Sequence, residues 1–325
     1  MMVKIDTQRR SLVRKIVFSE KIGLIVALVL VLIVFTVLTS GNFLSPNNII
    51  NILISSAIVG MVVIGECHLL ITAHVDLSPG SVAAFSGVFV SLLLRNKMPL
   101  LPAILIVVAV GLGIGFFNSH LVNRLKLEAF IATLATMSIF RGLAFIICNG
   151  KAVFVTNMNF LKMGSGRILG IPIPVIIFLM SYIIFIVLLD HTRFGRNVYM
   201  VGGNATAARL AGINAQSLRT KLYMITSGFA ALGGIIQAGR MSSGQPMTSE
   251  GLEFDAVTAV VLGGIAMSGG VGTLSGALIG LFIMQSFNNG LMMMNVPSFW
   301  QTVSRGLLLI TALSFDYIRN RKRNK

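Results

Sequence analysis

The sequence predicts an all-α protein, a polytopic bundle of about ten transmembrane helices. Of its 325 residues, 55% are hydrophobic and only 11% are charged, whereas a soluble domain carries about a quarter charged residues. Apolar runs of about the 20 residues that a bilayer core requires recur along the whole chain. None has the alternating pattern of a membrane β-barrel strand. We therefore expect helices, whose backbone groups are hydrogen-bonded internally.

The apolar runs divide the chain into one membrane domain, residues 22–317, between two basic tails, residues 1–21 and 318–325. An even number of spans keeps the two tails on one side, although the stretch 252–291 could be divided differently. The expected spans are residues 22–40, 49–73, 80–96, 100–122, 128–148, 171–190, 219–240, 252–268, 270–291 and 298–317.

Positive charge is distributed unevenly about these spans. Of 26 Lys and Arg residues, 18 fall on segments that share one side when the spans are counted from the N-terminus. Six fall on the other side, and Arg141 and Arg305 fall within spans. Because cytoplasmic loops are rich in Lys and Arg, both termini are expected to be cytoplasmic. No basic patch interleaved with aromatic residues accompanies the net charge of +16, so the expected partner is membrane lipid and no nucleic acid.

Small residues are frequent in several spans, including Gly111, Gly113, Gly115 and Gly234. Such residues let membrane helices approach closely, so a tightly packed bundle is expected. Cys67 and Cys148 lie within apolar runs and are read as small buried hydrophobic residues.

Two segments interrupt the apolar pattern with polar and turn-forming residues, HVDLSPGS at 74–81 and SSGQPMTSEGLEFD at 242–255. The span count places them on opposite faces of the membrane. An inverted repeat with a substrate site between its halves would have this arrangement, although the halves share no readable sequence identity. We expect a gating or packing role for His74, Asp76, Ser78, Pro79, Glu253 and Asp255.

Several catalytic and energy-coupling signatures are absent from the sequence. It contains no G-x-x-x-x-G-K-[ST] phosphate loop that could hold ATP. It shows no metal-ligand spacing and no nucleophile–base pairing, so no catalytic residue and no metal site is predicted. The spans also lack the ladder of carboxylates and histidines of a proton-coupled pump. The chain therefore has no visible energy source of its own.

Five positive charges lie between Arg193 and Lys221, three of them in the loop at residues 192–218, which also contains a predicted helix. Asn204 is a plausible N-cap, residues 205–211 are a strong helix-forming run, and Gly212 is a plausible C-terminal stop. A short helix on the inner face of the membrane is one that a cytoplasmic partner could hold. An ordinary solvated loop is the alternative.

Motifs in order along almost the whole chain resemble the permease subunits of the ribose/xylose/galactose-type ABC sugar importers. They lie at residues 76–81, 140–142, 192–196, 202–214, 252–256, 261–264, 268–273, 288–290 and 299–301. The resemblance implies an ABC importer permease fold and a bacterial inner-membrane location. It also implies a second permease copy or paralogue, cytoplasmic ATPase subunits that carry ATP and Mg, and a periplasmic or lipid-anchored sugar-binding protein.

In this family the loop 202–214 is the coupling loop that the ATPase holds. The resemblance assigns ATPase coupling to Gly202, Gly203, Asn204, Ala208, Arg209, Gly212 and Asn214. One departure is clear, because the family usually has Gly-Gly-Ile where this chain has residues 73–75, AHV. His74 is either a tolerated loop residue or a pH-sensitive group.

A sugar path needs hydrogen-bond donors and acceptors in an otherwise apolar tunnel. The predicted pathway residues are Asn288, Asn289, Trp300, Gln301 and Arg141. Arg141 and Arg305 are costly in lipid, so each must face the bundle interior, water or a partner, with Asp76, Glu253 and Asp255 as the nearest acidic candidates. The chain is thus predicted to be a monosaccharide permease subunit without enzymatic activity. A self-sufficient secondary transporter or channel for a small polar solute is the alternative.

Overall fold

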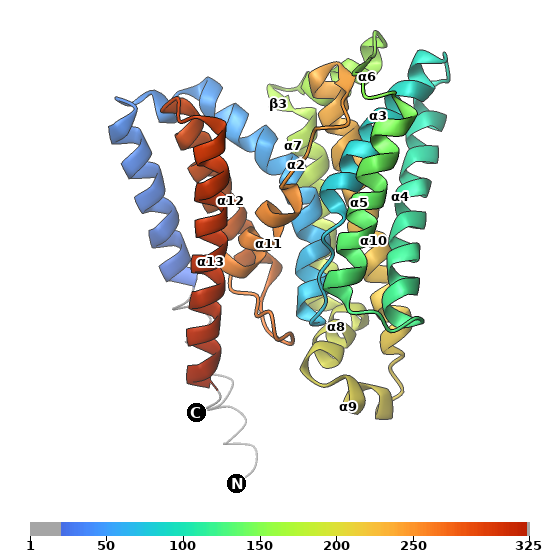
Figure 1. The fold of residues 1–325 in the computed structure, drawn as a ribbon. Coiled ribbons are helices and arrows are strands. Elements are labelled where there is room, and N and C mark those ends of the chain that lie inside the picture. The colour runs from blue at the N-terminus through green and yellow to red at the C-terminus, as the bar shows by residue number, and fades with distance from the viewer. Residues whose placement is uncertain (1–20, 324–325) are drawn as a thin grey trace.

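The computed structural model describes residues 21–323, which are mostly helical (Figure 1). Of the two predicted tails, residues 1–20 and 324–325 lie outside the described part of the chain. The first helix is Lys21–Leu38. The other helices are η1 Asn42–Leu44, α2 Pro46–Ile71, α3 Pro79–Arg95, α4 Leu100–Asn123, α5 Ala129–Ile147, α6 Met158–Ser165, α7 Ile173–His191, α8 Arg193–Gly203, α9 Ala205–Leu210, α10 Ala215–Met241, α11 Leu252–Leu262, α12 Leu274–Met293 and α13 Ser298–Arg323.

Each predicted span contains one of these helices, so the polytopic helical class is confirmed. Within residues 21–323, six helices are long and apolar enough to cross a membrane by themselves: the first helix, α2, α4, α5, α7 and α10. The largest differences from the predicted boundaries are at the ends of α11 and α13. α11 ends at Leu262, six residues before the expected end of its span, and α13 continues through Arg323, so part of the predicted C-terminal tail is helical.

α10 lies at the centre of the bundle and packs against α2, α3 and α4. Small residues make this approach possible: a β-carbon on Gly115 would overlap the backbone carbonyl of Tyr223, and one on Gly234 would overlap that of Ala83. Gly113, in contrast, faces open space. Close packing through small residues is therefore confirmed for the α4–α10 and α3–α10 contacts.

The two ends of the bundle carry different short elements (Figure 1). α6 lies at one end with four two-residue strands, β1 Val153–Phe154, β2 Arg167–Ile168, β3 Ile171–Pro172 and β4 Ser243–Gly244. β1 pairs antiparallel with β4, Val153 opposite Gly244, and β2 pairs with β3, Arg167 opposite Pro172. α8 and α9 lie at the other end, where α13 also ends.

Two interruptions approach the middle of the bundle from these opposite ends. Residues 72–78 run from the end of α2, beside α8, to the start of α3, and residues 242–251 descend from the end of α10, near α6, to α11 (Figure 1). The first turns of α3 and α11 then meet, because a β-carbon on Gly80 would overlap the Glu253 carboxylate. The two interruptions start from opposite ends of the bundle, as the predicted placement on opposite faces requires. The order of long helix, interruption and shorter helix, repeated in opposite directions, is the order of an inverted repeat.

Candidate functional site

A cleft of about 980 Å³ opens between α5 and α13. The end of the 242–251 segment and the first turn of α11 lie between these two helices and form part of the cleft wall. The lining residues are Met137, Ser138, Arg141, Phe145, Met247, Glu250, Gly251, Glu253, Phe254, Thr302, Arg305, Gly306 and Leu309. The cleft therefore combines apolar walls with four charged side chains, as a path for a polar solute requires.

Arg141 fixes the 242–251 segment to α5. Its Nη1 donates to the backbone oxygens of Pro246, at 2.8 Å, and Thr248, at 2.7 Å. These short, charge-assisted bonds are among the stronger ones in proteins. The predicted intramembrane arginine therefore faces the bundle interior, and it holds in place the backbone that leads into α11.

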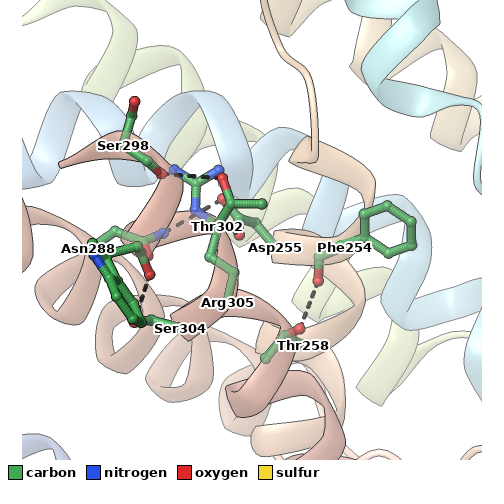
Figure 2. A network of polar contacts seen from close by, with 9 residues as sticks. Phe254, Asp255, Thr258, Asn288, Ser298, Thr302, Ser304 and Arg305 are labelled. Atoms are coloured by element: carbon green, nitrogen blue, oxygen red, sulfur yellow. Dashed lines mark hydrogen bonds and ion pairs between the residues drawn. The ribbon is translucent and has the colours of Figure 1, made fainter.

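Asp255 joins three helices at the back of the cleft. Arg305 on α13 lies 3.8 Å from Asp255 Oδ1 through its Nε, and Asn288 on α12 donates through Nδ2 to Asp255 Oδ2 at 3.4 Å. Figure 2 shows both side chains pointing at the Asp255 carboxylate. Asp255 and Asn288 are buried. Sequence reasoning named Asp255 as a candidate partner for an intramembrane arginine, and the pairing with Arg305 confirms it.

Glu253 lies where the two interruptions meet. Its side chain is only 3% exposed, and its Oε2 has no hydrogen-bond partner among the described residues. The carboxylate sits against the first turn of α3 at Gly80, where the helix dipole favours negative charge. An unsatisfied acceptor in the wall of a cleft is a group that an incoming hydroxyl could satisfy.

The remaining predicted pathway residues lie away from the lining of the cleft as the described residues define it. Asn289 accepts a hydrogen bond of 2.9 Å from Asn48 on α2. Gln301 donates to the Val296 oxygen at 2.8 Å, and Trp300 is 58% exposed on the first turn of α13. The structure thus brings Arg141 and Asn288 close to the Glu253–Asp255 turn, but it does not bring Asn289, Trp300 or Gln301 there.

Asp76 organises the start of α3. It is fully buried, and its Oδ1 accepts from the Ser78 amide at 2.8 Å and the Ser78 hydroxyl at 2.7 Å. Asn118 on α4 donates to the Ser78 hydroxyl at 2.8 Å. Such bonds from an Asp to the backbone two residues later stabilise a turn. Ser78 directly precedes Pro79, the first residue of α3. Of the gating and packing roles considered for this segment, these contacts indicate packing for Asp76 and Ser78.

His74 lies outside the spans, in the interruption beside the α8–α9 end. Its Nδ1 is 3.0 Å from the Thr72 oxygen, and its ring meets the Tyr223 ring edge-on. Burial lowers the pKa of His74 to about 4, and the positive charge of Arg219 contributes in the same direction. The ring is therefore neutral at physiological pH, which argues against a pH-sensing role.

Glu66 is a buried group that sequence reasoning missed. It lies on α2 with no exposed surface, and neither carboxylate oxygen has a hydrogen-bond partner among the described residues. It is close enough to Asp76 for the two carboxyl groups to interact. The available signal was that Glu66 is the only charged residue in the 26-residue run of α2.

The loop 192–218 folds into two helices and the start of a third. The predicted helix is confirmed as α9, with Asn204 Oδ1 accepting from the Ala207 amide at 2.9 Å and Gly212 at φ +81°. Asn214 caps α10 in the same way, accepting from the Ser217 amide at 2.9 Å. α8 was not predicted. Beside α9 lies a groove of about 690 Å³, whose lining residues include Ala205, Thr206, Arg209, Gly212, Ile213 and Asn214.

Metal and disulfide chemistry find no support in the part of the chain that the structure describes. Residues 21–323 contain no cluster of three or more His, Cys, Asp or Glu residues that could hold a metal ion. Cys67 and Cys148 are buried free thiols, as predicted.

Apolar helices that are interrupted beside a cleft with charged lining residues define a polytopic membrane transport protein. Comparison with known proteins makes the class specific. The model of the family described as "Branched-chain amino acid transport system / permease component" matches residues 48–313, and the chain belongs to this family.

The relatives include sugar permeases. The chain is 39% identical over 300 residues to the L-arabinose ABC transporter permease protein AraH of Azospirillum brasilense, covering 92% of this chain and 88% of that protein. It is 37% identical over 299 residues to the ribose import permease protein RbsC of Bacillus subtilis (strain 168), covering 91% and 92%. No solved structure matches the chain. The predicted resemblance to ABC sugar-importer permeases is confirmed.

Proposed function

We propose that this chain forms the translocation pathway for a monosaccharide, a pentose or hexose, in an ABC importer of a bacterial cytoplasmic membrane. The observation that carries the proposal is the cleft between α5 and α13, whose wall includes the first turn of α11. It presents Arg141, Glu253 and Arg305 to a solute that is rich in hydroxyl groups. The names of the relatives, which are permeases for ribose and L-arabinose, support the choice of substrate class.

The proposed path enters past the first turn of α13, where Trp300 and Gln301 lie, and continues along the cleft to Glu253. Asn288 supports this path from behind, because it holds Asp255. Asn289 is proposed to have a structural role, because its hydrogen bond with Asn48 joins α12 to α2. In this reading Asp76 and Ser78 keep the start of α3 in place beside the path.

The α8–α9 end of the bundle is proposed to face the cytoplasm, with both termini there. The excess of Lys and Arg on this side supports the orientation. α9, with Asn204, Ala208 and Arg209, then offers its groove to a cytoplasmic ATPase subunit. ATP and Mg are bound by that subunit, and this chain acts as a transport subunit without enzymatic activity or cofactor of its own. A periplasmic or lipid-anchored binding protein delivers the sugar to the α6 end.

A second permease copy or paralogue is proposed to cover the cleft. The cleft opens sideways between α5 and α13 and carries Glu250, Glu253, Arg141 and Arg305. Charged groups that face hydrocarbon cost several kcal/mol each, so a protein surface, and not lipid, is the neighbour that suits this opening.

The test is uptake of radiolabelled ribose and L-arabinose into proteoliposomes that contain this chain, its ATPase subunit and its binding protein. We expect uptake of one sugar that requires ATP and the binding protein. Flux driven by an ion gradient in liposomes holding this chain alone would overturn the proposal in favour of a secondary transporter or channel.

The path itself is tested by Asn288→Ala, with Ser304→Ala as its matched control. The Ser304→Ala substitution also removes a polar group near the start of α13. The Ser304 hydroxyl donates to the Trp300 oxygen of its own helix, so its loss breaks no contact between helices that the structure describes. We expect Asn288→Ala to reduce the uptake rate at equal expression, and Ser304→Ala to leave it unchanged. Equal rates for the two variants would show that Asn288 does not support the path.

A further inference from the structure

Three backbone segments meet beside the end of α8. The Gly270 amide donates to the Ile71 oxygen at 2.8 Å, and Gly202 on the last turn of α8 covers this bond. A β-carbon on Gly202 would overlap the Ile71 oxygen and lie 2.7 Å from the Gly270 nitrogen. We call Ile71, Gly202, Gly269 and Gly270 the glycine junction. It has no space for a side chain at residue 202.

Of the two adjacent glycines at the end of α8, only Gly202 must lack a side chain. Gly203 follows directly on α8, and a β-carbon there would meet nothing within 4 Å. Gly269 also belongs to the contact, because its φ is +84° and a β-carbon on it would lie 3.1 Å from the Gly202 oxygen. Since left-handed backbone of this kind favours glycine, the turn is built to bring its backbone against α8.

A second contact from α8 reaches the same turn. The Tyr199 hydroxyl donates to the Gly272 oxygen at 2.8 Å. Tyr199 and Gly202 are three residues apart and thus share a face of α8. α8 therefore holds the turn that follows α11 at two points, one through a side chain and one through the backbone.

The glycine junction lies where residues 72–78 begin and in the turn that follows α11. Ile71 is the last residue of α2, from which residues 72–78 lead to α3, and the 263–273 turn leaves the other end of α11. At their first turns α3 and α11 are again in contact, at Gly80 and Glu253. α11 is thus connected at one end to the first turn of α3 and at the other end to the last residue of α2, and α8 touches the end opposite the cleft.

We propose that the glycine junction transmits displacement of the α8–α9 loop to α3 and α11 together, and so to the cleft wall at Glu253. This inference rests on the proposed function, in which an ATPase holds that loop. The contact is made of backbone atoms, which cannot change rotamer to absorb a shift. A displacement of α8 must therefore either move Ile71 and the 263–273 turn or separate α8 from them.

The test compares Gly202→Ala with Gly113→Ala, a glycine-to-alanine change on α4, in the reconstituted importer. Three quantities are measured: ATPase subunit retained on purification, ATP hydrolysis rate, and sugar taken up per ATP hydrolysed. We expect Gly113→Ala to match the wild type in all three, because a β-carbon on this α4 glycine meets no described residue within 4 Å. Gly202→Ala should retain the ATPase and continue to hydrolyse ATP, with uptake per ATP reduced about tenfold, the scale of a typical coupling energy between sites.

Tyr199→Phe is the second variant, because it removes only the hydroxyl and adds no atoms to a packed contact. We expect it to reduce uptake per ATP about threefold, the scale of one hydrogen bond. If Gly202→Ala and Tyr199→Phe transport with the wild-type ratio, or lose hydrolysis and uptake in parallel, the glycine junction does not couple the two. If the wild-type complex itself shows no ATP-dependent uptake, the proposed function fails, and the proposal built on it fails with it.

Discussion

The two hydrogen bonds of Arg141 predict a measurable local stability for the 242–251 segment. Arg141→Met keeps much of the apolar stem but removes both donors, which leaves the carbonyls of Pro246 and Thr248 unpaired. A hydrogen bond to a charged group contributes about 1.5–3 kcal/mol. Arg141 is half-buried, so the lower value applies, and the two bonds together contribute about 3 kcal/mol.

Hydrogen exchange of the purified protein in detergent, read by mass spectrometry on peptides covering residues 242–251, measures this loss. A loss of about 3 kcal/mol corresponds to about a hundredfold faster exchange, since each 1.4 kcal/mol is a factor of about ten. Arg240→Met is the matched control, because Arg240 is half-buried too and makes a single 3.4 Å bond to the Ser55 hydroxyl. Exchange no faster in Arg141→Met than in Arg240→Met would refute the assignment of Arg141 as the clamp of this segment.

Three further predictions concern the remaining parts of the site. Asn204→Ala should destabilise α9 by about 1 kcal/mol through loss of its N-cap, and so weaken co-purification of the ATPase subunit. Glu253→Gln removes the charge of a buried acceptor and should raise the KM for sugar uptake about tenfold, the scale of one charged hydrogen bond. His74→Gly should leave the pH profile of uptake unchanged from about pH 5.5 to 8. Burial keeps the pKa of His74 near 4, so its ring is neutral throughout that range.

For each of these three variants, one result would contradict the prediction. ATPase retention equal to the wild type in Asn204→Ala would show that the cap is irrelevant to docking. A Glu253→Gln variant with the wild-type KM would place sugar binding elsewhere in the cleft. A shift of the uptake pH profile by a whole unit in His74→Gly would mean that His74 titrates during transport. The transporter would then pass through a state in which His74 is less buried.

Features that depend on local chain chemistry were predictable from the sequence. The apolar runs located the membrane helices, because hydrophobic length alone decides what can cross a bilayer. The run from Asn204 to Gly212 predicted α9, because capping and helix propensity act within a few residues. The motifs predicted the family. The intramembrane Arg305 called for an acidic partner, and Asp255, one of three candidates, is that partner.

Only the tertiary structure decided which residues of a helix face the interior of the bundle. Asn288 and Asn289 are neighbours in sequence, yet one bonds to Asp255 and the other to Asn48. Gly202 and Gly203 are likewise adjacent, but a β-carbon has space at only one of them. Successive residues on an α-helix point about 100° apart. α12 is apolar nearly all round, so its periodicity does not say which direction is the interior. That direction is set by packing against other helices.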